Sequence, residues 1–348
     1  MNSLFEVQWK SPSNIALVKY WGKFGNQLPK NPSISFTLKH SVTTLSISVK
    51  ESSTSSLKFY FEGIENPKFQ EKILKFLDSC RSRFPWLINH HLEIHSSNTF
   101  PHSSGIASSA SSMSALCLSL LSVDEFFTGN ILSKDEFLNK ASELSRLASG
   151  SAARSVFPGL ASWGECSAIL SSTNQFATPF NEAHEIFRNY CDSILIVDAG
   201  EKAVSSRAGH GLMENHPFKE QRFLRANQNL IQLVAALKTG DLKSFIEIVE
   251  EEALTLHALM MTSNPSYILL KPQSLWLIER IKKYRSEKNI PVCFTIDAGP
   301  NIHLLYPKSF ETQVRLWIES ELAESLVEIK WIHDEVGSGP EKKIIERN

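Results

Sequence analysis

Apolar side chains recur along the first half of the chain with two different periods. Residues 43–49 (TTLSISV) and 57–61 (LKFYF) alternate apolar and polar positions, as a half-buried strand does. Residues 68–83 instead repeat at helical spacing, with Phe69, Ile73, Phe76 and Leu77 on one side. Another helix is expected over residues 134–148, with Ser133 as its N-cap, and another strand at residues 92–95. This half is therefore expected to combine a sheet with covering helices.

Serine is so frequent between residues 103 and 122 that the stretch resembles a linker. Its leucines and alanines are nevertheless strong helix formers, and Gly105 stands just before the expected start. We therefore predict a helix here.

The pattern restarts near residue 190 with a fully apolar strand, residues 193–197. The elements expected after it are helices at about 217–238, 242–261 and 272–286 and strands at 292–296, 302–306 and 327–332. We place a domain boundary here, giving domains 1–190 and 191–348, with the last segment expected to return toward the first domain. The alternation predicts an α+β protein with helices covering antiparallel sheets.

Composition narrows the function classes. The 348 residues are 42% hydrophobic and 21% charged, with 36 basic against 37 acidic side chains, which is typical of a globular protein. Without a run of Lys and Arg, the electrostatic attraction that drives nucleic-acid binding is missing, so we expect no nucleic-acid partner. No window reaches the roughly 18 apolar residues of a membrane span, so we expect a cytoplasmic protein without membrane contact. The five scattered cysteines form no CxxC pair and are expected to be buried.

Two small-residue loops are candidate anion sites. Residues 101–110 (PHSSGIASSA) bring backbone N–H groups and hydroxyls to a helix start, where the helix dipole favours negative charge. The loop matches neither GxxxxGK[ST] nor GxGxxG, and a tight turn with capping serines explains it equally well. Residues 149–155 (SGSAARS) add Arg154, whose planar fork suits a carboxylate or phosphate; a solvated arginine is the alternative.

Two further segments carry charge near strands. Residues 14–23 (NIALVKYWGK) would place Lys19 and Lys23 on one face of a strand with Trp21, and solvated lysines on a half-buried strand are the plainer explanation. Asp297 ends an apolar strand, where a carboxylate can act as a base or simply cap a turn. Asp198 has nearly the same local sequence, so form alone does not choose between them. The histidines show no metal-ligand spacing, and we expect no metal site made of protein ligands alone.

Together these segments resemble one family, diphosphomevalonate decarboxylase of the GHMP kinase superfamily. The resemblance rests on NIALVKYWGK (14–23), NPSISFTL (31–38), FPHSSGIASSAS (100–111), SGSAARS (149–155), EKAVSSRAGH (201–210), IDAGPN (296–301) and EVGSGPE (335–341). It implies a two-domain GHMP kinase fold, with an N-terminal domain like ribosomal protein S5 domain 2 and a ferredoxin-like C-terminal domain. The site would lie in the cleft between them, and family members are usually homodimers.

The implied reaction is the ATP-dependent decarboxylation of mevalonate 5-diphosphate to isopentenyl diphosphate, CO2, ADP and phosphate, in isoprenoid biosynthesis. The resemblance makes Asp297, Arg154 and Lys19 catalytic. The substrate-binding residues it implies are Tyr20, Trp21, Lys23, Lys68, Ser149, Ser151 and Arg154. The residues it implies for the ATP phosphates are Ser104, Gly105, Ala107, Ser108, Ser109, Lys202, Ser205 and Ser206. Mg²⁺ would arrive with ATP and reach the protein through Ser108.

The chain departs from the family pattern at Phe24, where an arginine is common, and at His210, where a methionine is frequent. A family arginine falls at Lys68, which keeps the charge but loses the fork. Alternatives are a GHMP-type kinase or a decarboxylase acting on mevalonate or a phosphomevalonate, and a catalytically silent relative.

Overall fold

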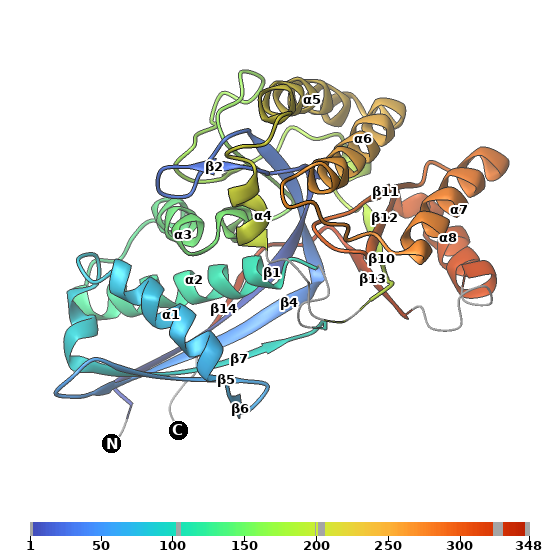
Figure 1. The fold of residues 1–348 in the computed structure, drawn as a ribbon. Coiled ribbons are helices and arrows are strands. Elements are labelled where there is room, and N and C mark those ends of the chain that lie inside the picture. Colours follow the sequence, from blue (N-terminus) through green and yellow to red (C-terminus); the bar gives the residue numbers. More distant parts are fainter. Residues whose placement is uncertain (1–2, 102–105, 199, 201–205, 323–329, 345–348) are drawn as a thin grey trace.

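The computed structural model describes residues 3–101, 106–198, 200, 206–322 and 330–344. Within them, the chain forms two main sheets with helices packed against both (Figure 1). The first sheet consists of β1 (Phe5–Val18), β4 (Ser33–Glu51), β5 (Ser56–Phe61), β6 (Ile64–Glu65), β7 (His90–Asn98), β8 (Leu160–Trp163), β9 (Thr178–Pro179) and β14 (Glu341–Ile344). The second consists of β10 (Cys191–Ile196), β11 (Cys293–Thr295), β12 (Ile302–Tyr306) and β13 (Lys330–Glu335), and a small hairpin joins β2 (Lys23–Phe24) to β3 (Leu28–Pro29).

The helices divide between the two sheets. They are α1 (Pro67–Ser79), α2 (Ser108–Thr128), α3 (Lys134–Ala148), α4 (Ser206–Leu212), α5 (Lys219–Thr239), α6 (Leu242–Met261), α7 (Pro272–Lys288) and α8 (Glu311–Trp317). Figure 1 shows α1 and α2 lying along one face of the first sheet, with α7 and α8 beside the second. The apolar side chains of α5 and α6 share one core with β1, β4 and β10, which ties the two halves of the chain together.

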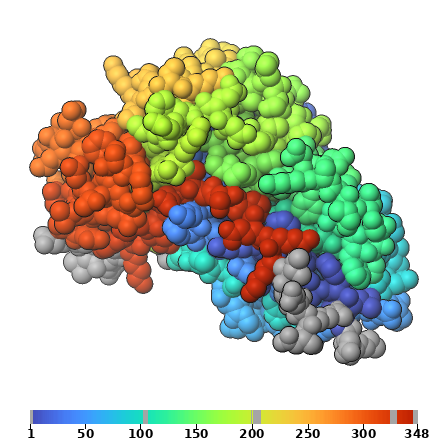
Figure 2. Space-filling model, turned by 180° about the vertical axis from the view of Figure 1, so that it is seen from behind, coloured from blue at the N-terminus to red at the C-terminus, as the bar shows by residue number. Residues whose placement is uncertain are grey.

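Antiparallel pairing dominates both sheets, in the order β14-β1-β4-β7-β5-β6 and β11-β12-β10-β13; among the described strands, only β5 and β7 run parallel. The last strand, β14, pairs with β1, so the end of the described chain returns to the first sheet. Figure 2 shows this red segment running from the second sheet across the back of the molecule onto the blue strands.

The serines of α2 let an apolar helix pack on all sides. Ser114 is hydrogen-bonded to Ser11 at 2.5 Å, Ser111 to Thr43 at 2.6 Å, and Ser119 donates to the Ala115 carbonyl at 2.8 Å. Each buried hydroxyl therefore has a partner, which removes the cost of burying it. Although we expected no membrane-length apolar segment, α2 is long and apolar enough by length and composition; its residues are mostly buried inside the protein.

The predicted helices agree well with the structure. α3 begins and ends at the predicted residues, and a capping box of Ser133 and Glu136 fixes its start. α6 also has the predicted ends, and α1 stops at Ser79 rather than at residue 83. All five cysteines are free and buried, as expected.

Candidate functional site

Lys19 and Asp297 meet where the two sheets join. Lys19 directly follows β1, and Asp297 follows β11 by two residues. The hydroxyl of Thr295 donates to the Ala16 carbonyl at 3.4 Å, so the two strand ends lie side by side. The Lys19 ammonium donates to Asp297 Oδ1 at 2.7 Å, with side chains 2% and 24% exposed. A buried cation is thus held against a carboxylate that solvent and ligands can reach.

The strand interpretation of residues 19–23 is wrong. β1 ends at Val18, and Gly22 has φ +96°, a conformation that favours glycine and turns the chain toward β2. Lys19 is buried rather than solvated, and Lys23 donates to Gln27 Oε1 at 2.8 Å from the start of β2. The two lysines therefore do not share a strand face.

Burial lowers the pKa of the Lys19 ammonium, although the neighbouring Asp297 carboxylate opposes this shift. If the charged form is required, kcat should fall on the alkaline side with a midpoint below the ordinary value of 10.5. The Lys19→Arg variant should move this limb to higher pH, because a guanidinium keeps its proton. Burial raises the pKa of Tyr20, so its phenol does not account for the limb. A limb that stays in place in Lys19→Arg would contradict the assignment.

Arg154 lies in the 3₁₀ helix Gly150–Val156 and is 2% exposed. Its Nε donates to Ser35 Oγ at 3.0 Å and its Nη1 to Ser33 Oγ at 2.6 Å. Ser33 and Ser35 alternate along β4 and so face the same side of the sheet. In the described residues no hydrogen bond is formed by Nη2. Burial lowers the pKa of Arg154 to about 10, which leaves it charged at neutral pH, and Asp297 is close enough to oppose that shift.

Tyr20 packs directly against the loop after α3. A Cβ added to Gly150 would lie 2.9 Å from both Cε1 and the hydroxyl oxygen of Tyr20, so only glycine permits this approach. The same loop carries Ser149 and Ser151, and Asn14 donates to the Ser151 carbonyl at 3.1 Å. Tyr20, Ser149 and Ser151, which were predicted together from the sequence, therefore belong to one packed unit.

His210 lies between two aromatic side chains. Its ring centroid is 4.4 Å from that of Tyr20 and 4.5 Å from that of Trp21, and its Nδ1 accepts the Gly22 N–H at 3.0 Å. Burial, with the Lys23 and Arg154 cations, lowers the pKa of His210 to about 3, so the ring is neutral. The histidine at position 210, where the family often has methionine, therefore packs against residues 20–22 and adds no charge.

Trp21 is 4% exposed and packs with Met213, Leu256 and Ala298 in an apolar cluster. Lys68 lies exposed in the first turn of α1, beside Phe69. No contact in the described part of the chain joins Lys68 to Lys19 or Arg154, so its part in substrate binding stays a prediction.

The aspartates of the two Asp-Ala-Gly segments have different contacts. Asp198 Oδ1 accepts the Gly200 N–H at 2.7 Å, which is the turn-capping role, whereas Asp297 faces the Lys19 ammonium. Contacts across the fold thus make the distinction that local sequence does not.

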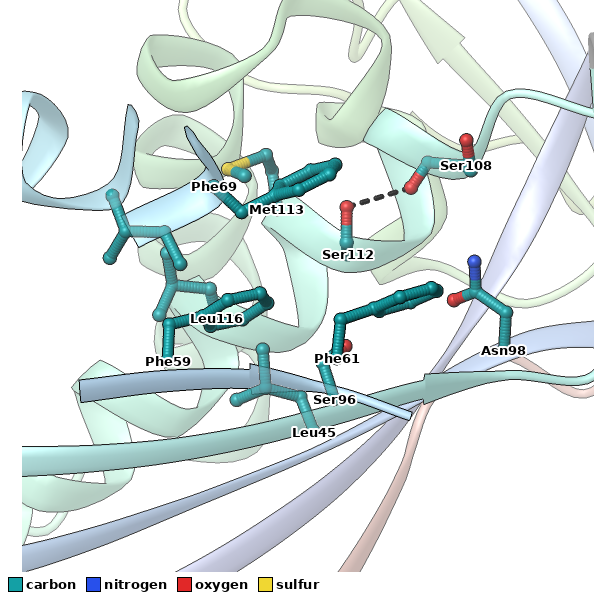
Figure 3. A pocket seen from close by; sticks show the side chains of 11 residues that line it. Leu45, Phe59, Phe61, Phe69, Ser96, Asn98, Ser108, Ser112, Met113 and Leu116 are labelled. Carbon is teal, nitrogen blue, oxygen red and sulfur yellow. Dashed lines mark hydrogen bonds between the residues drawn. The ribbon is translucent and has the colours of Figure 1, made fainter. Parts of the chain in front are cut away.

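The start of α2 carries no side-chain cap among the described residues, and its first turn presents backbone N–H groups. Its N-cap, Ala107, has φ 47° and ψ 40° and provides no side-chain capping bond. Ser108, the first helical residue, lines an adjoining pocket with Ser96, Asn98 and three phenylalanines, Phe59, Phe61 and Phe69. Figure 3 shows Ser108 and Asn98 together at one end of this pocket, with the aromatic rings of Phe61 and Phe69 beside them.

Several predicted phosphate contacts cannot be placed. Ser104, Gly105, Lys202 and Ser205 lie outside the described residues. Ser109 is in the first turn of α2, and Ser206 begins α4. In the described ranges no three His, Cys, Asp or Glu side chains gather as metal ligands.

Two models of known protein families match this chain. Residues 11–174 match the diphosphomevalonate decarboxylase-like N-terminal domain, and residues 193–342 match the mevalonate 5-diphosphate decarboxylase C-terminal domain. The chain belongs to the diphosphomevalonate decarboxylase family. Its fold is accordingly the two-domain GHMP kinase fold that the resemblance implied.

Individual relatives agree over nearly the whole chain. The diphosphomevalonate decarboxylase of Ganoderma lucidum is 27% identical over 88% of this chain and 79% of its own. The mevalonate diphosphate decarboxylase structure from Staphylococcus aureus has a TM-score of 0.84 at 28% identity, covering 97% of this chain and 98% of its own. A structure described as MDDEF in complex with MVAPP, AMPPCP and magnesium has a TM-score of 0.84 at 29% identity, covering 98% and 99%.

The family motifs did not predict the residues that hold the site residues in place. Ser33 and Ser35, which hold Arg154, lie in the NPSISFTL segment, and Asn14 begins NIALVKYWGK. Glu252 and Arg222, which contact the backbone of Lys19, lie outside every motif. The first three could have been suspected from their place in matching segments; the last two carry no local signal.

Proposed function

We propose that this chain catalyses the ATP-dependent decarboxylation of mevalonate 5-diphosphate, giving isopentenyl diphosphate, CO2, ADP and phosphate. The observation that carries the proposal is the Lys19–Asp297 pair beside the buried Arg154, in a chain of this family. A reaction that removes both an oxygen and a carboxylate from adjacent carbons needs a group for each, and the site provides both.

Asp297 would lie against the tertiary C3 hydroxyl of the substrate, where it orients the hydroxyl and accepts its proton. The Lys19 ammonium, 2.7 Å from Asp297, would offset the negative charge that develops there. ATP, bound with Mg²⁺, supplies the phosphoryl group that turns the C3 oxygen into a leaving group. When that phosphate leaves, the electrons of the breaking bond to the carboxylate form the new double bond.

Arg154 suits the carboxylate. Ser33 and Ser35 hold Nε and Nη1, so the guanidinium plane is fixed before the substrate arrives. A fixed fork sets the torsion of the carboxylate and aligns the carbon–carbon bond that must break. Tyr20, Lys23, Ser149 and Ser151 would bind the diphosphate at the other end of the substrate.

The start of α2 fits ATP. The N–H groups at the start of α2, which no side chain in the described residues caps, suit a phosphate, and the aromatic pocket beside Ser108 suits a flat base. These two features adjoin, as the two ends of one nucleotide require. Ser108 and Ser109 are the described hydroxyls that would contact the phosphates, and Ser108 would reach the magnesium ion.

The Ser108→Ala variant is expected to raise KM for ATP about tenfold or more, because hydrogen bonds to charged groups contribute ~1.5–3 kcal/mol. Steady-state kinetics with ATP varied would measure it. Ser119→Ala is the control, because Ser119 lies on the same helix, donates to the Ala115 carbonyl and is not among the described residues that line the pocket. Equal KM values in both variants would exclude Ser108 from the ATP site.

Product identity tests the proposed function. With ATP and Mg²⁺, the protein should convert mevalonate 5-diphosphate to isopentenyl diphosphate, as followed by ³¹P NMR, and the 5-monophosphate should react more slowly. Faster turnover of the monophosphate would make the protein a decarboxylase of that substrate instead. No conversion of either would leave the catalytically silent relative.

We further propose a cytoplasmic homodimer. The support is the family resemblance, since usual members are dimers. Sedimentation equilibrium should give the mass of two chains, and the mass of one chain would overturn the dimer.

A further inference from the structure

A buried ion pair holds the main chain of Lys19 from both sides. Arg222 of α5 donates to Glu252 of α6 through two bonds of 2.8 and 2.7 Å, and the side chains are 1% and 0% exposed. The Glu252 carboxylate accepts the Lys19 backbone N–H at 2.9 Å, and Arg222 Nη2 donates to the Lys19 carbonyl at 2.8 Å. The ion pair thus forms hydrogen bonds with both the backbone N–H and the backbone carbonyl of Lys19.

Two side-chain amides add hydrogen bonds to Glu252 and to the Lys19 backbone. Asn229 donates to Glu252 Oε1 at 2.7 Å, and Asn31 donates to the Lys19 carbonyl at 3.0 Å. The carboxylate therefore accepts four hydrogen bonds, which fixes its orientation. Buried ion pairs are costly to desolvate and are poor sources of stability. A role in fixing geometry explains this pair better than a role in stability.

The same helix also holds the partner of Lys19. His257, five residues after Glu252 on α6, donates from Nε2 to the Asp297 carbonyl at 3.1 Å. One rigid helix therefore contacts the backbone of Lys19 and of Asp297, whose side chains meet at 2.7 Å.

We propose that Glu252, braced by Arg222, is a positioning residue that acts through Lys19 and sets its ammonium against Asp297. This inference rests on the proposed function. Glu252 contacts the backbone of Lys19 rather than the reacting atoms, so its effect should appear in kcat more than in substrate binding. Misplacing a reacting group by about 1 Å can cost on the order of a hundredfold in rate.

Glu252 also acts on Lys19 through its charge. The charged or titratable groups around Lys19 are Asp297, Glu252, Arg154, Arg222 and Asp192. The Glu252 carboxylate raises the pKa of the Lys19 ammonium against the effect of burial. Removing this negative charge should lower that pKa further, so the alkaline limb of kcat should move to lower pH.

The Glu252→Gln variant tests the proposal. An amide offers one acceptor oxygen where the carboxylate offers two, so the Lys19 N–H and the Arg222 fork no longer both find an acceptor. We expect kcat to fall at least tenfold, KM for both substrates to stay within threefold, and the alkaline limb to move to lower pH. Wild type is assayed in parallel to separate the decarboxylase function from the positioning role of Glu252. No CO2 from wild type refutes the function. When wild type is active, the variant tests the role of Glu252.

Glu250→Gln is the matched control. Glu250 lies two residues earlier on α6 and pairs with Arg285 at 2.6 and 3.1 Å, away from Lys19. Both variants lose an ion pair and should lower Tm, but Glu250→Gln should keep kcat within twofold. Equal kcat values in the two variants, or an alkaline limb that does not move in Glu252→Gln, would overturn the proposal.

Arg222→Lys keeps the test decisive if Glu252→Gln does not fold. The lysine preserves the buried positive charge but cannot bridge Glu252 and the Lys19 carbonyl. It should lower kcat at least tenfold with KM nearly unchanged, and a wild-type kcat would overturn the proposal.

Discussion

The Asp297→Asn variant is expected to lose turnover while binding ATP within a few-fold of wild type. Asparagine keeps the size of the side chain but neither accepts the proton of the C3 hydroxyl nor carries the charge that pairs with Lys19 at 2.7 Å. CO2 release and ATP binding, measured on the same preparation, would check this. A variant that keeps more than about a tenth of wild-type kcat, a difference of ~1.4 kcal/mol, would remove Asp297 from the mechanism.

Asp198→Asn is the matched control for that experiment. Asp198 sits in the same Asp-Ala-Gly sequence at the end of an apolar strand, but it caps its own turn through the Gly200 N–H. This variant should keep kcat within a few-fold. A comparable loss in both variants would mean that the two aspartates had been assigned wrongly.

The Arg154→Lys variant is expected to lose ~2–4 kcal/mol of transition-state stabilisation, or about thirty- to a thousandfold in rate. Lysine keeps the charge, but it cannot bond Ser33, Ser35 and a substrate carboxylate in one plane. CO2 release under saturating ATP would measure the loss.

Arg285→Lys supplies the control for Arg154, because Arg285 is a partly buried arginine of α7 that pairs with Glu250 and the Val292 carbonyl. Its CO2 release should stay within a few-fold of wild type. Near-normal CO2 release from Arg154→Lys would show that the substrate carboxylate is held elsewhere.

Local signals predicted the helices well. Ser133, predicted as the N-cap, fixes the start of α3 together with Glu136. The structure adds Asp241, which was not predicted as a cap and which begins α6 by accepting from Lys243 and Ser244. The long strands were harder: β4 runs over Ser33–Glu51, but only residues 43–49 alternate clearly. Its first part is buried on both faces, which erases the period-two pattern on which prediction depends.

The site, too, was predicted only in part. Asp297, Arg154 and Lys19 were predicted through the family motifs, but whether Lys19 is buried could not be read from its spacing to Trp21. Its backbone is held by Arg222 and Glu252 and its ammonium by Asp297, all more than two hundred positions along the chain. Such contacts leave no mark on local sequence, since Arg222 and Glu252 occupy ordinary helical positions.

Parallel measurement of CO2 and ADP shows whether this chain couples decarboxylation to phosphoryl transfer. The protein is incubated with mevalonate 5-diphosphate, ATP and Mg²⁺, and both products are followed in the same tube, with the 5-monophosphate as control. We expect equal amounts of CO2 and ADP from the diphosphate. ADP without CO2 would contradict this expectation, because the chain would then phosphorylate its substrate without the elimination for which Arg154 is proposed to hold the carboxylate.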